Sequence, residues 1–275
     1  MLRLISDKRQ YLKEFTENNY AQGAFFWTYL IKNKEIKVNG KRVSADVILE
    51  EGDEICYFLT KKQEEKAAFH LVYEDENILI VDKESGVNSE AVYAALLRQR
   101  ECYFIHRLDR NTQGLIAFAL NMRAEQALLQ AFQERKVEKI YHALCVGTLP
   151  TKGATLTAYL QKDAEKSLVR VYDTPRKGAE QIITQYKVLD KVDEFTRIEV
   201  ILHTGKTHQI RAHLAHIGCP IVGDMKYGDS AVNKAYKVAR QCLVAKFLRF
   251  DMDGEWAYLQ VKQWQSRFDA GLEKI

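Results

Sequence analysis

Four strand-like segments follow one another in the middle of the chain, at residues 139–147, 167–172, 181–189 and 195–202. Two more are expected at residues 71–73 and 78–82, on either side of a turn at 74–77. Many strands with few helices are typical of an α+β protein rather than of alternating strand and helix units. We therefore predict an α+β fold with a mainly antiparallel or mixed β-sheet and flanking helices.

Three helices are predicted. The first covers the apolar, aromatic-rich residues 20–33, and the last covers residues 207–217 and ends at Gly218. Between them, Asn121 is placed to cap a helix with one apolar face. That face consists of Ala124, Ala127, Leu128, Ala131 and Phe132.

The chain is expected to divide into residues 1–62 and residues 69–275. Asn39-Gly40 lies between β-branched residues, which is a strong hairpin signal because both turn positions favour positive φ. A second turn at residues 50–53 precedes a strand expected at 54–59. Residues 60–68 are charged and carry no apolar period, so they are predicted to be a linker.

Length and composition exclude several classes of protein. The 275 residues allow one or two domains, and no apolar run reaches the 18 or so residues of a membrane helix. The N-terminus has no apolar signal region, so a soluble cytoplasmic protein is expected, with no membrane partner. Five cysteines without a C-x-x-C pair fit a reducing compartment, and a net charge of +4 permits nucleic-acid binding without requiring it.

Asp109 is the first candidate for chemistry. It lies in the polar stretch 106–114, between Arg107 and Arg110, where positive charge favours the ionised carboxylate. An ionised aspartate can attack a sugar carbon as a nucleophile. Taken alone, the residue fits a loop aspartate in a surface ion pair better than a nucleophile.

Residues 202–213 are the second dense stretch, with Lys206, Arg211 and several histidines and no acidic residue. Gly205-Lys206-Thr207 is not a phosphate-binding P-loop, because that motif needs a glycine where Val200 stands. A metal site is disfavoured because the histidines lack a convincing spacing and a nearby cysteine or carboxylate. A capped helix with solvated basic residues is the alternative; the histidines are His203, His208, His213 and His216.

Cations also surround the Asn39-Gly40 hairpin, with Glu35 alone opposing them. Such a hairpin could follow a phosphate backbone, or it could be a solvated charged face. The cations are Lys32, Lys34, Lys37, Lys41 and Arg42.

Three ordered segments together resemble the RluA-type pseudouridine synthases. Residues 106–114 (HRLDRNTQG) resemble the catalytic loop of that family, residues 139–143 (KIYHA) resemble its tyrosine strand, and residues 204–228 resemble its third motif. The resemblance covers about residues 69–250. Residues 15–59 more loosely resemble the alpha-L RNA-binding module, through the helix, the hairpin and Glu51-Gly52-Asp53.

The resemblance implies an enzyme that breaks the glycosidic bond of a uridine in RNA, rotates the uracil and rejoins it through C5. Asp109 would be the nucleophile, Tyr141 would stack on the base, and Arg211 would pair with Asp109. Arg107 would fill the gap left by the flipped uridine. The reaction involves no redox change and no hydrolysis, so neither cofactor nor metal is expected.

The resemblance also implies contacts to RNA, with ribosomal RNA preferred to transfer RNA. The sequence does not indicate an oligomeric state, and a monomer is the default expectation. The expected contacts in the catalytic domain are Arg107, Arg110, Thr112, Lys206, His208 and Gln209. Those in the N-terminal module are Lys37, Lys41 and Arg42.

The chain departs from the pattern of the family in places. Asn111 and Gln113 stand where aspartate and serine are usual, Lys206 replaces an arginine and its bidentate fork, and no proline follows the lysine at position 83. These departures affect substrate choice more than chemistry. They also motivate an alternative, a non-catalytic RNA-binding or ribosome-assembly protein that retains the fold.

Overall fold

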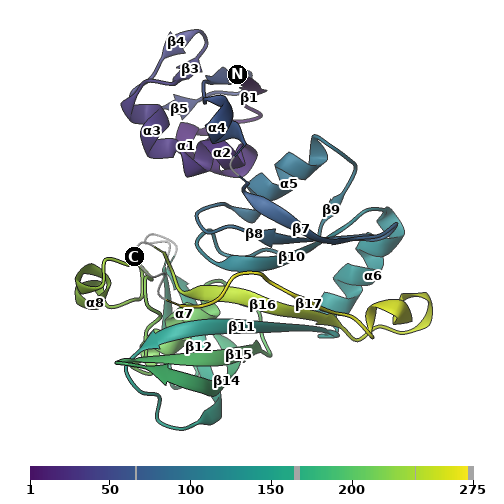
Figure 1. Cartoon of the computed structure of the whole chain (residues 1–275), viewed down its shortest axis with the longest axis vertical. Helices are drawn as coiled ribbons and strands as arrows, with labels where there is room; N and C mark the ends of the chain where they lie inside the picture. Colours follow the sequence, from purple (N-terminus) through teal and green to yellow (C-terminus); the bar gives the residue numbers. More distant parts are fainter. Residues whose placement is uncertain (66, 164–167, 239, 272–275) are drawn as a thin grey trace. The chain divides into compact units, whose positions relative to one another are not determined.

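The computed structural model describes residues 1–65, 67–163, 168–238 and 240–271. The chain forms two compact units (Figure 1). Unit 1 comprises Met1–Arg110 and Ile116–Glu125, and unit 2 comprises Asn111–Leu115 and Gln126–Ile275. The elements are mixed α and β with strands predominating, which confirms the predicted α+β class.

The first 59 residues, called here the N-terminal module, have an apolar core of their own. An antiparallel sheet runs in the order β1 (Leu2–Ile5), β6 (Glu54–Tyr57), β3 (Ile36–Val38), β4 (Lys41–Arg42), and β2 (Gln10–Tyr11) pairs with β5 (Ile48–Leu49). The helices are α1 (Leu12–Asn19), α2 (Ala21–Phe25) and α3 (Trp27–Lys32). The buried core residues are Leu12, Phe15, Tyr20, Leu30, Ile36, Leu49, Ile55 and Tyr57.

In this module, the sequence prediction is wrong for one helix and correct for the hairpin. The single helix predicted over 20–33 is instead α2 followed by α3, separated at Phe26. The hairpin prediction is confirmed: Asn39 and Gly40 have φ of 49° and 79°, as a tight β3–β4 turn requires. The Asn39 side chain also accepts from the Glu54 N–H at 2.9 Å, which ties the turn to β6.

The predicted linker, residues 60–68, contains the short helix α4 (Lys61–Glu64). Thr60 and Gln63 form a reciprocal capping box, a local signal that apolar periodicity does not reveal. Glu64 in turn accepts a hydrogen bond from Tyr20 of the module.

The rest of unit 1 carries β7 (Phe69–Glu74) and β8 (Ile78–Lys83), paired antiparallel as the two predicted strands. It also contains α5 (Ser89–Leu97), which the sequence analysis did not predict, and β9 (Tyr103–Phe104). Helix α1 packs against α5. Unit 1 thus includes both the N-terminal module and residues up to 110, and the predicted domain boundary at 62–69 stays a prediction.

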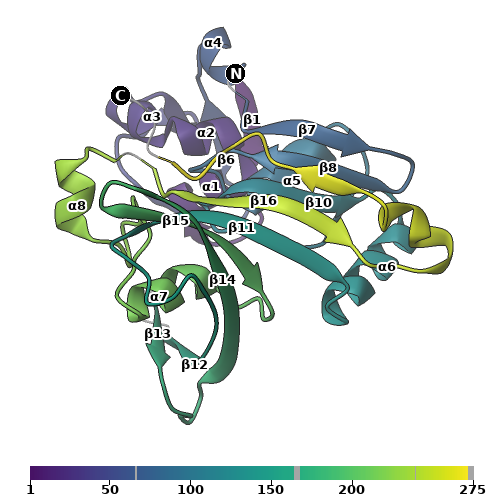
Figure 2. The same ribbon diagram turned by 60° about the horizontal axis from the view of Figure 1, so that its bottom comes forward.

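Unit 2 is built on a curved antiparallel sheet (Figure 2). Its strand order is β13 (Leu168–Tyr172), β12 (Gly153–Asp163), β14 (Glu180–Val192), β15 (Phe195–Leu202), β11 (Val137–Val146), β16 (Leu243–Phe250). Strand β17 (Gln263–Gln265) pairs with β16 on its other side. The four strands predicted between 139 and 202 are confirmed over the described residues, with residue 167 of the second lying outside them. Strands β12 and β16 were not predicted.

Strand β10 (Gln113–Ala119) has residues in both units. Gln113 and Gly114 pair in parallel with β16 in unit 2, whereas Phe118 and Ala119 pair antiparallel with β9 in unit 1. This parallel pairing among antiparallel ones confirms the mixed sheet.

Helix α6 (Met122–Gln133) begins as predicted, with Asn121 Oδ1 accepting from the Ala124 N–H at 2.9 Å. Helix α7 (Gln209–His216) packs against β13 and β14 (Figure 2), and Gly218 at its end has φ 79°. Helix α8 (Ser230–Ala235) follows, capped by Asp229. Among the described residues, no helix combines the length and apolar character needed to cross a bilayer.

Candidate active site

In unit 1, the backbone on both sides of Asp109 is held by hydrogen bonds. The Ser89 hydroxyl accepts from the Leu108 N–H at 2.9 Å and donates to the Leu108 carbonyl at 3.1 Å. On the other side, the Arg110 carbonyl accepts from the Gly86 N–H at 2.9 Å. These contacts use main-chain atoms, so they fix the loop without depending on the side chain at position 109.

Lys83 contributes the third contact to this loop. Its side chain is fully buried, and its Nζ donates to the carbonyls of Glu84 (2.9 Å), Val87 (2.8 Å) and Arg110 (3.0 Å). Burial, the largest effect, lowers the pKa of Lys83 to about 7, although the nearby Asp109 carboxylate raises it. The sequence analysis noted Lys83 only for the absence of a following proline; its anchoring role was missed.

The two arginines beside Asp109 have acidic partners within unit 1. Arg107 forms an ion pair with Glu90 at 2.9 Å and stays largely exposed. Arg110 forms an ion pair with Glu17 of α1 and donates from Nε to the Gly86 carbonyl at 3.2 Å. Arg107 is thus exposed to solvent, whereas Arg110 joins the segment around Asp109 to the N-terminal module.

In unit 2, Tyr141 is buried on β11 between two neighbouring strands. It pairs with Val200 of β15 and with Ala245 of β16. The register against β16 shifts between Ile140 and Tyr141, an irregularity that reorients side chains and is common beside active sites.

Gly114 lies on the other side of Ala245, where β10 comes unusually close to β16. A Cβ at Gly114 would lie 2.3 Å from the Ala245 carbonyl oxygen, and φ is +116°. Only glycine is compatible with this approach. The register Gly114–Ala245–Tyr141 is therefore set by glycine, a residue that the loop resemblance already contained.

Arg211 on α7 forms a buried bidentate ion pair with Asp224. Its Nε lies 2.6 Å from Asp224 Oδ2 and its Nη2 lies 2.9 Å from Oδ1. Oδ1 also accepts the N–H groups of Lys226 and Tyr227. Burial alone would raise the pKa of Asp224, but Arg211 and these N–H groups bring it below its usual value. The Tyr227 ring lies 5.2 Å from the Arg211 guanidinium.

Asp224, the partner of the predicted site residue Arg211, is what the sequence analysis most clearly missed. It belongs to the segment 204–228 that carried the family resemblance, but no local signal connects it to Arg211, 13 residues earlier. The predicted pairing of Arg211 with Asp109 joins residues of different units and stays a prediction.

Two residues predicted to contact RNA are almost completely buried. Gln209 accepts from the Thr204 hydroxyl at 2.9 Å and donates to the Ile183 carbonyl at 3.1 Å, so it joins the start of α7 to β14. The Thr112 hydroxyl accepts from Gln241 at 3.1 Å. Their hydrogen bonds are within the protein, and their predicted RNA contacts stay predictions.

Lys206 and His208 lie beside the start of α7. Lys206 forms an ion pair with Glu180 of β14. His208 has φ 56°, a left-handed conformation that is uncommon for a histidine, and its Nδ1 lies 2.9 Å from the Tyr227 hydroxyl. Both residues are more accessible than Gln209.

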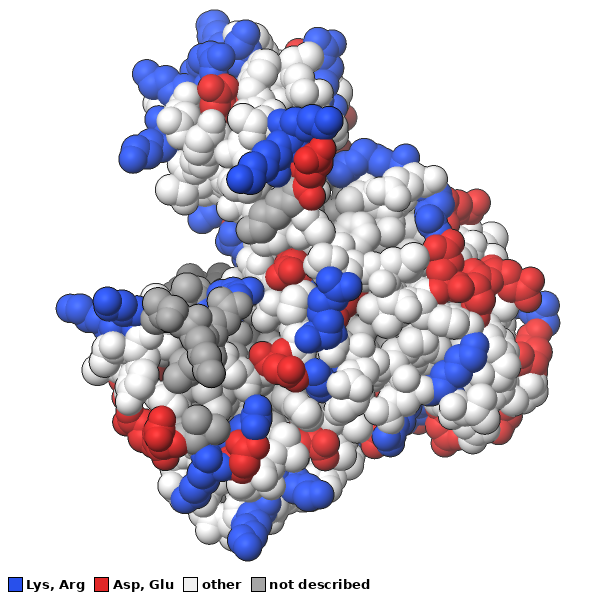
Figure 3. Space-filling view, in the orientation of Figure 1, with Lys and Arg blue, Asp and Glu red and all other residues white. Residues whose placement is uncertain are grey.

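In the N-terminal module, lysines and arginines gather over the β3–β4 hairpin and its surroundings (Figure 3). Lys37 and Arg42 lie 5.6 and 5.5 Å from the centre of the Phe58 ring. Lys41 pairs with Val38 across the hairpin and is exposed. Arg42 also forms an ion pair with Glu35 at 3.0 Å, so Glu35 opposes it as the sequence indicated.

The histidines considered for a metal site have other partners. His213 Nδ1 lies 3.0 Å from the Thr184 hydroxyl, and His216 Nε2 lies 2.8 Å from Asp173. Within residues 1–65, 67–163, 168–238 and 240–271, no three His, Cys, Asp or Glu side chains are grouped to hold a metal ion.

The three predicted catalytic residues are thus distributed over the two units. Tyr141 and Arg211 lie in unit 2, on β11 and α7, and Asp109 lies in unit 1. Each lies in a segment held by specific hydrogen bonds or strand pairing, and their joint action stays a prediction.

Comparison with known proteins gives one consistent result. Residues 77–216 match the family described as RNA pseudouridylate synthase, a range that includes Asp109, Tyr141 and Arg211. The chain is 32% identical over 225 residues to ribosomal large subunit pseudouridine synthase C of Vibrio parahaemolyticus, covering 73% of this chain and 70% of that protein. It is 30% identical over 254 residues to ribosomal large subunit pseudouridine synthase D of Pseudomonas aeruginosa, covering 80% and 77%.

A solved structure agrees. Human RNA pseudouridylate synthase domain containing 1 is 26% identical to this chain, with a TM-score of 0.59, and the match covers 67% of this chain and 79% of that one. Human RNA pseudouridylate synthase domain containing 4 has the same fold, with a TM-score of 0.60 at 20% identity.

Proposed function

Because this chain belongs to the RNA pseudouridylate synthase family and is thus an isomerase acting on RNA, we propose that its substrate is a uridine of ribosomal RNA. The observation that carries the proposal is the family match over 77–216, which contains all three predicted catalytic residues. The names of the two bacterial relatives, both ribosomal large subunit enzymes, favour ribosomal over transfer RNA. We expect the protein to act as a monomer and to be located in the cytoplasm.

In the proposed reaction, the bond between uracil N1 and ribose C1′ breaks and a bond between C5 and C1′ forms. Asp109 attacks the sugar or assists formation of a glycal, and the uracil rotates before it is rejoined. The C5 proton is then removed and N1 is left protonated, so the product is an isomer of the substrate. The atoms and electrons of this isomerisation balance without an oxidant, a water molecule or a cofactor.

Tyr141 is proposed to hold the detached uracil against its ring and to help remove the C5 proton. An aromatic face can hold a planar base while it turns. The paired strands on both sides of Tyr141 support this role because they limit the movement of the ring.

Arg211 is proposed to keep Asp109 ionised and correctly directed. Its bidentate pair with Asp224 fixes the guanidinium, which supports a positioning role because a mobile arginine could not direct a carboxylate. Arg107 is proposed to enter the space that the uridine leaves, where a guanidinium can stack and donate hydrogen bonds.

The test is pseudouridine mapping of total RNA from a strain that lacks the gene. The strain is rescued in parallel with the wild type, with Asp109→Asn and with Asp173→Asn, an exposed carboxylate of unit 2 used as a matched control. We expect the loss of a discrete ribosomal RNA site that the wild type and the control restore and Asp109→Asn does not.

Two results would count against the proposal. Restoration of the site by Asp109→Asn would exclude Asp109 as the nucleophile. Loss of a site in transfer RNA alone would exclude ribosomal RNA as the substrate. If every site persists, purified protein is incubated with unmodified ribosomal RNA transcripts. Binding without isomerisation would then favour the alternative, a non-catalytic RNA-binding or ribosome-assembly protein.

A further inference from the structure

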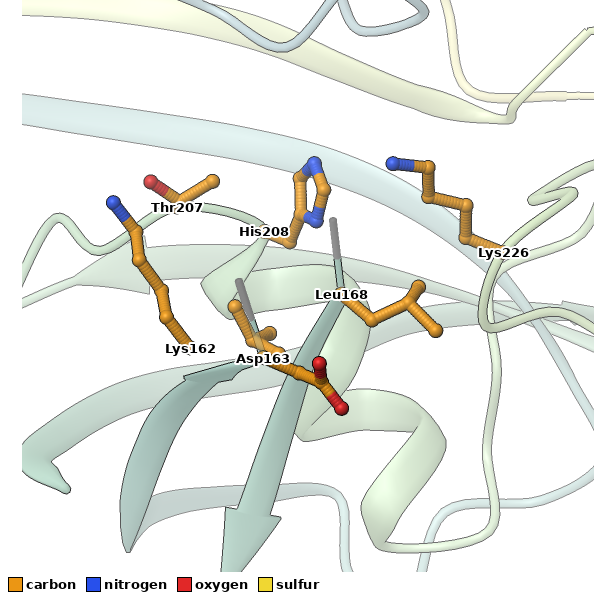
Figure 4. Close-up of a pocket in the computed structure, with 7 residues that line it drawn as sticks. Lys162, Asp163, Leu168, Thr207, His208 and Lys226 are labelled. Carbon is orange, nitrogen blue, oxygen red and sulfur yellow. The ribbon is translucent and has the colours of Figure 1, made fainter. Parts of the chain in front are cut away.

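A cavity of about 290 Å³ opens in unit 2 beside the start of α7. It is lined by residues from the end of β12, the start of β13, the segment before α7 and the loop after it (Figure 4). The lining residues are Lys162, Asp163, Leu168, Val169, Thr207, His208 and Lys226. We propose that this cavity binds a backbone phosphate of the RNA, with its ribose, at a nucleotide other than the target uridine.

The charge of the lining favours an anion. Lys162 and Lys226 contribute two ammonium groups, and Asp163 is the single carboxylate among the lining residues that the structure describes. Arg170 lies 3.2 Å from Asp163 and balances its charge. The described residues of the cavity and its rim therefore carry a net positive charge, which a phosphodiester would neutralise.

The remaining lining residues suit the rest of a nucleotide. Thr207 offers a hydroxyl, and Leu168 and Val169 give an apolar wall against which a ribose or base can pack. Figure 4 shows the His208 imidazole between Thr207 and Lys226, with the Lys226 side chain extending toward the ring. The volume is close to the lower limit of about 300 Å³ for ligand pockets, which suits one nucleotide rather than a larger group.

The wall of the cavity is fixed by a hydrogen-bond chain. The Val169 N–H donates to the Tyr227 hydroxyl at 2.9 Å, and that hydroxyl lies 2.9 Å from His208 Nδ1. His208 has a left-handed backbone, and backbone strain of this kind persists where the surrounding structure enforces it, often at binding sites. The wall formed by Val169 and His208 is therefore held by hydrogen bonds within the protein.

The same loop connects the cavity to the predicted catalytic arginine. Asp224 accepts the backbone N–H groups of Lys226 and Tyr227 while it binds Arg211. A phosphate held by Lys226 would thus contact the loop that positions Arg211. The proposal rests on RNA being the substrate, and it adds a second contact region on unit 2 for that RNA.

The test compares the double variant Lys162→Gln/Lys226→Gln with the control Lys152→Gln/Lys187→Gln. The control removes two exposed lysines near the other end of β12, ten residues or about 30 Å along the strand from Lys162. Equilibrium binding of a ribosomal RNA fragment is measured at several salt concentrations, and kcat is measured with saturating RNA.

We expect the pocket variant to bind roughly 10-fold more weakly, with a salt slope smaller by about 1, because one phosphate contact is lost. The control should bind like the wild type. Equal binding by the wild type and the pocket variant would overturn the proposal, and so would an equal loss in the control, because that would show only a general charge effect.

Two further measurements distinguish an RNA contact from a free-nucleotide site and from a failure of the proposed function. Uridine monophosphate should bind far more weakly than the RNA fragment; equal affinity would show a free-nucleotide site and overturn the RNA assignment. If the wild type binds the fragment but never isomerises it, the proposed function fails. The binding comparison then still shows whether the pocket contacts RNA.

Discussion

The segments around Asp109 in unit 1 and Arg211 in unit 2 are both held firmly, but by different means. Around Asp109, Ser89 and Lys83 hold main-chain atoms of Leu108 and Arg110. Around Arg211, Asp224 holds the side chain itself. The first arrangement holds the loop through its main-chain atoms, whereas the second depends on the arginine side chain itself.

This difference predicts how substitutions behave. A change at Asp109 should remove chemistry and leave the fold, because the anchors of the loop stay in place. A change in the Arg211–Asp224 pair should also reduce stability, because it leaves a buried charge without its partner. The following predictions test or extend this contrast, from the largest expected effect to the smallest.

Asp109→Asn should lower kcat by roughly 10⁴-fold or more, the scale expected when a nucleophile is removed. The free energy of unfolding should change by about 1 kcal/mol or less, as is usual for a substitution outside a core. Single-turnover kinetics and urea unfolding measure the two quantities on the same preparations. A large loss of stability would show that the loop depends on its aspartate and would remove the contrast.

Asp224→Asn should lower the free energy of unfolding by about 3–5 kcal/mol, because Arg211 would stay buried without an opposite charge. The double variant Arg211→Met/Asp224→Leu should recover most of this stability while remaining inactive. Urea unfolding checks the first statement and kinetics the second. If Asp224→Asn is as stable as the wild type, the Arg211–Asp224 pair does not contribute to the stability of the fold.

Lys83→Met should lower the free energy of unfolding by about 2–3 kcal/mol, since the carbonyls of Glu84, Val87 and Arg110 would lose their hydrogen-bond donor. It should also lower kcat, because the Arg110 carbonyl beside Asp109 loses an anchor. Lys246→Met is the matched control, as Lys246 is also buried and donates to the Ser266 and Phe268 carbonyls in unit 2. The control should lose stability and keep kcat; an equal fall of kcat in both variants would exclude a positioning role for Lys83.

The pH dependence of stability gives the smallest effect. The pKa of Lys83 is lowered to about 7 in the fold, mainly by burial, so above pH 7 the unfolded chain binds more protons than the folded chain. Stability from this group therefore rises with pH, by about 1 kcal/mol between pH 7 and pH 8. Urea unfolding should show that the difference in free energy of unfolding between the wild type and Lys83→Met is larger at pH 8 than at pH 7. An equal difference at the two pH values would contradict the lowered pKa.

Local signals in the sequence predicted a large part of the architecture. Asn39-Gly40 predicted its turn, Asn121 predicted its helix start, and the strand-like runs predicted most of β11, β13, β14 and β15. Each signal acts over a few residues, so it does not depend on the rest of the chain. The order of the three motifs likewise predicted the family, which the comparisons confirm.

The partners of the site residues required the tertiary structure. Lysine is usually exposed, so no local signal predicts that Lys83 is buried in unit 1. The sequence likewise predicts Gln209 and Thr112 as RNA contacts, and only the structure shows that they are buried. The pairing of Arg211 with Asp224 depends on how the chain after α7 returns to that helix. Sequence thus determined turns, helix starts, strand runs and the family. The fold alone decided which side chains are buried and which charges meet, because burial and ion pairing depend on segments that only the folded chain brings together.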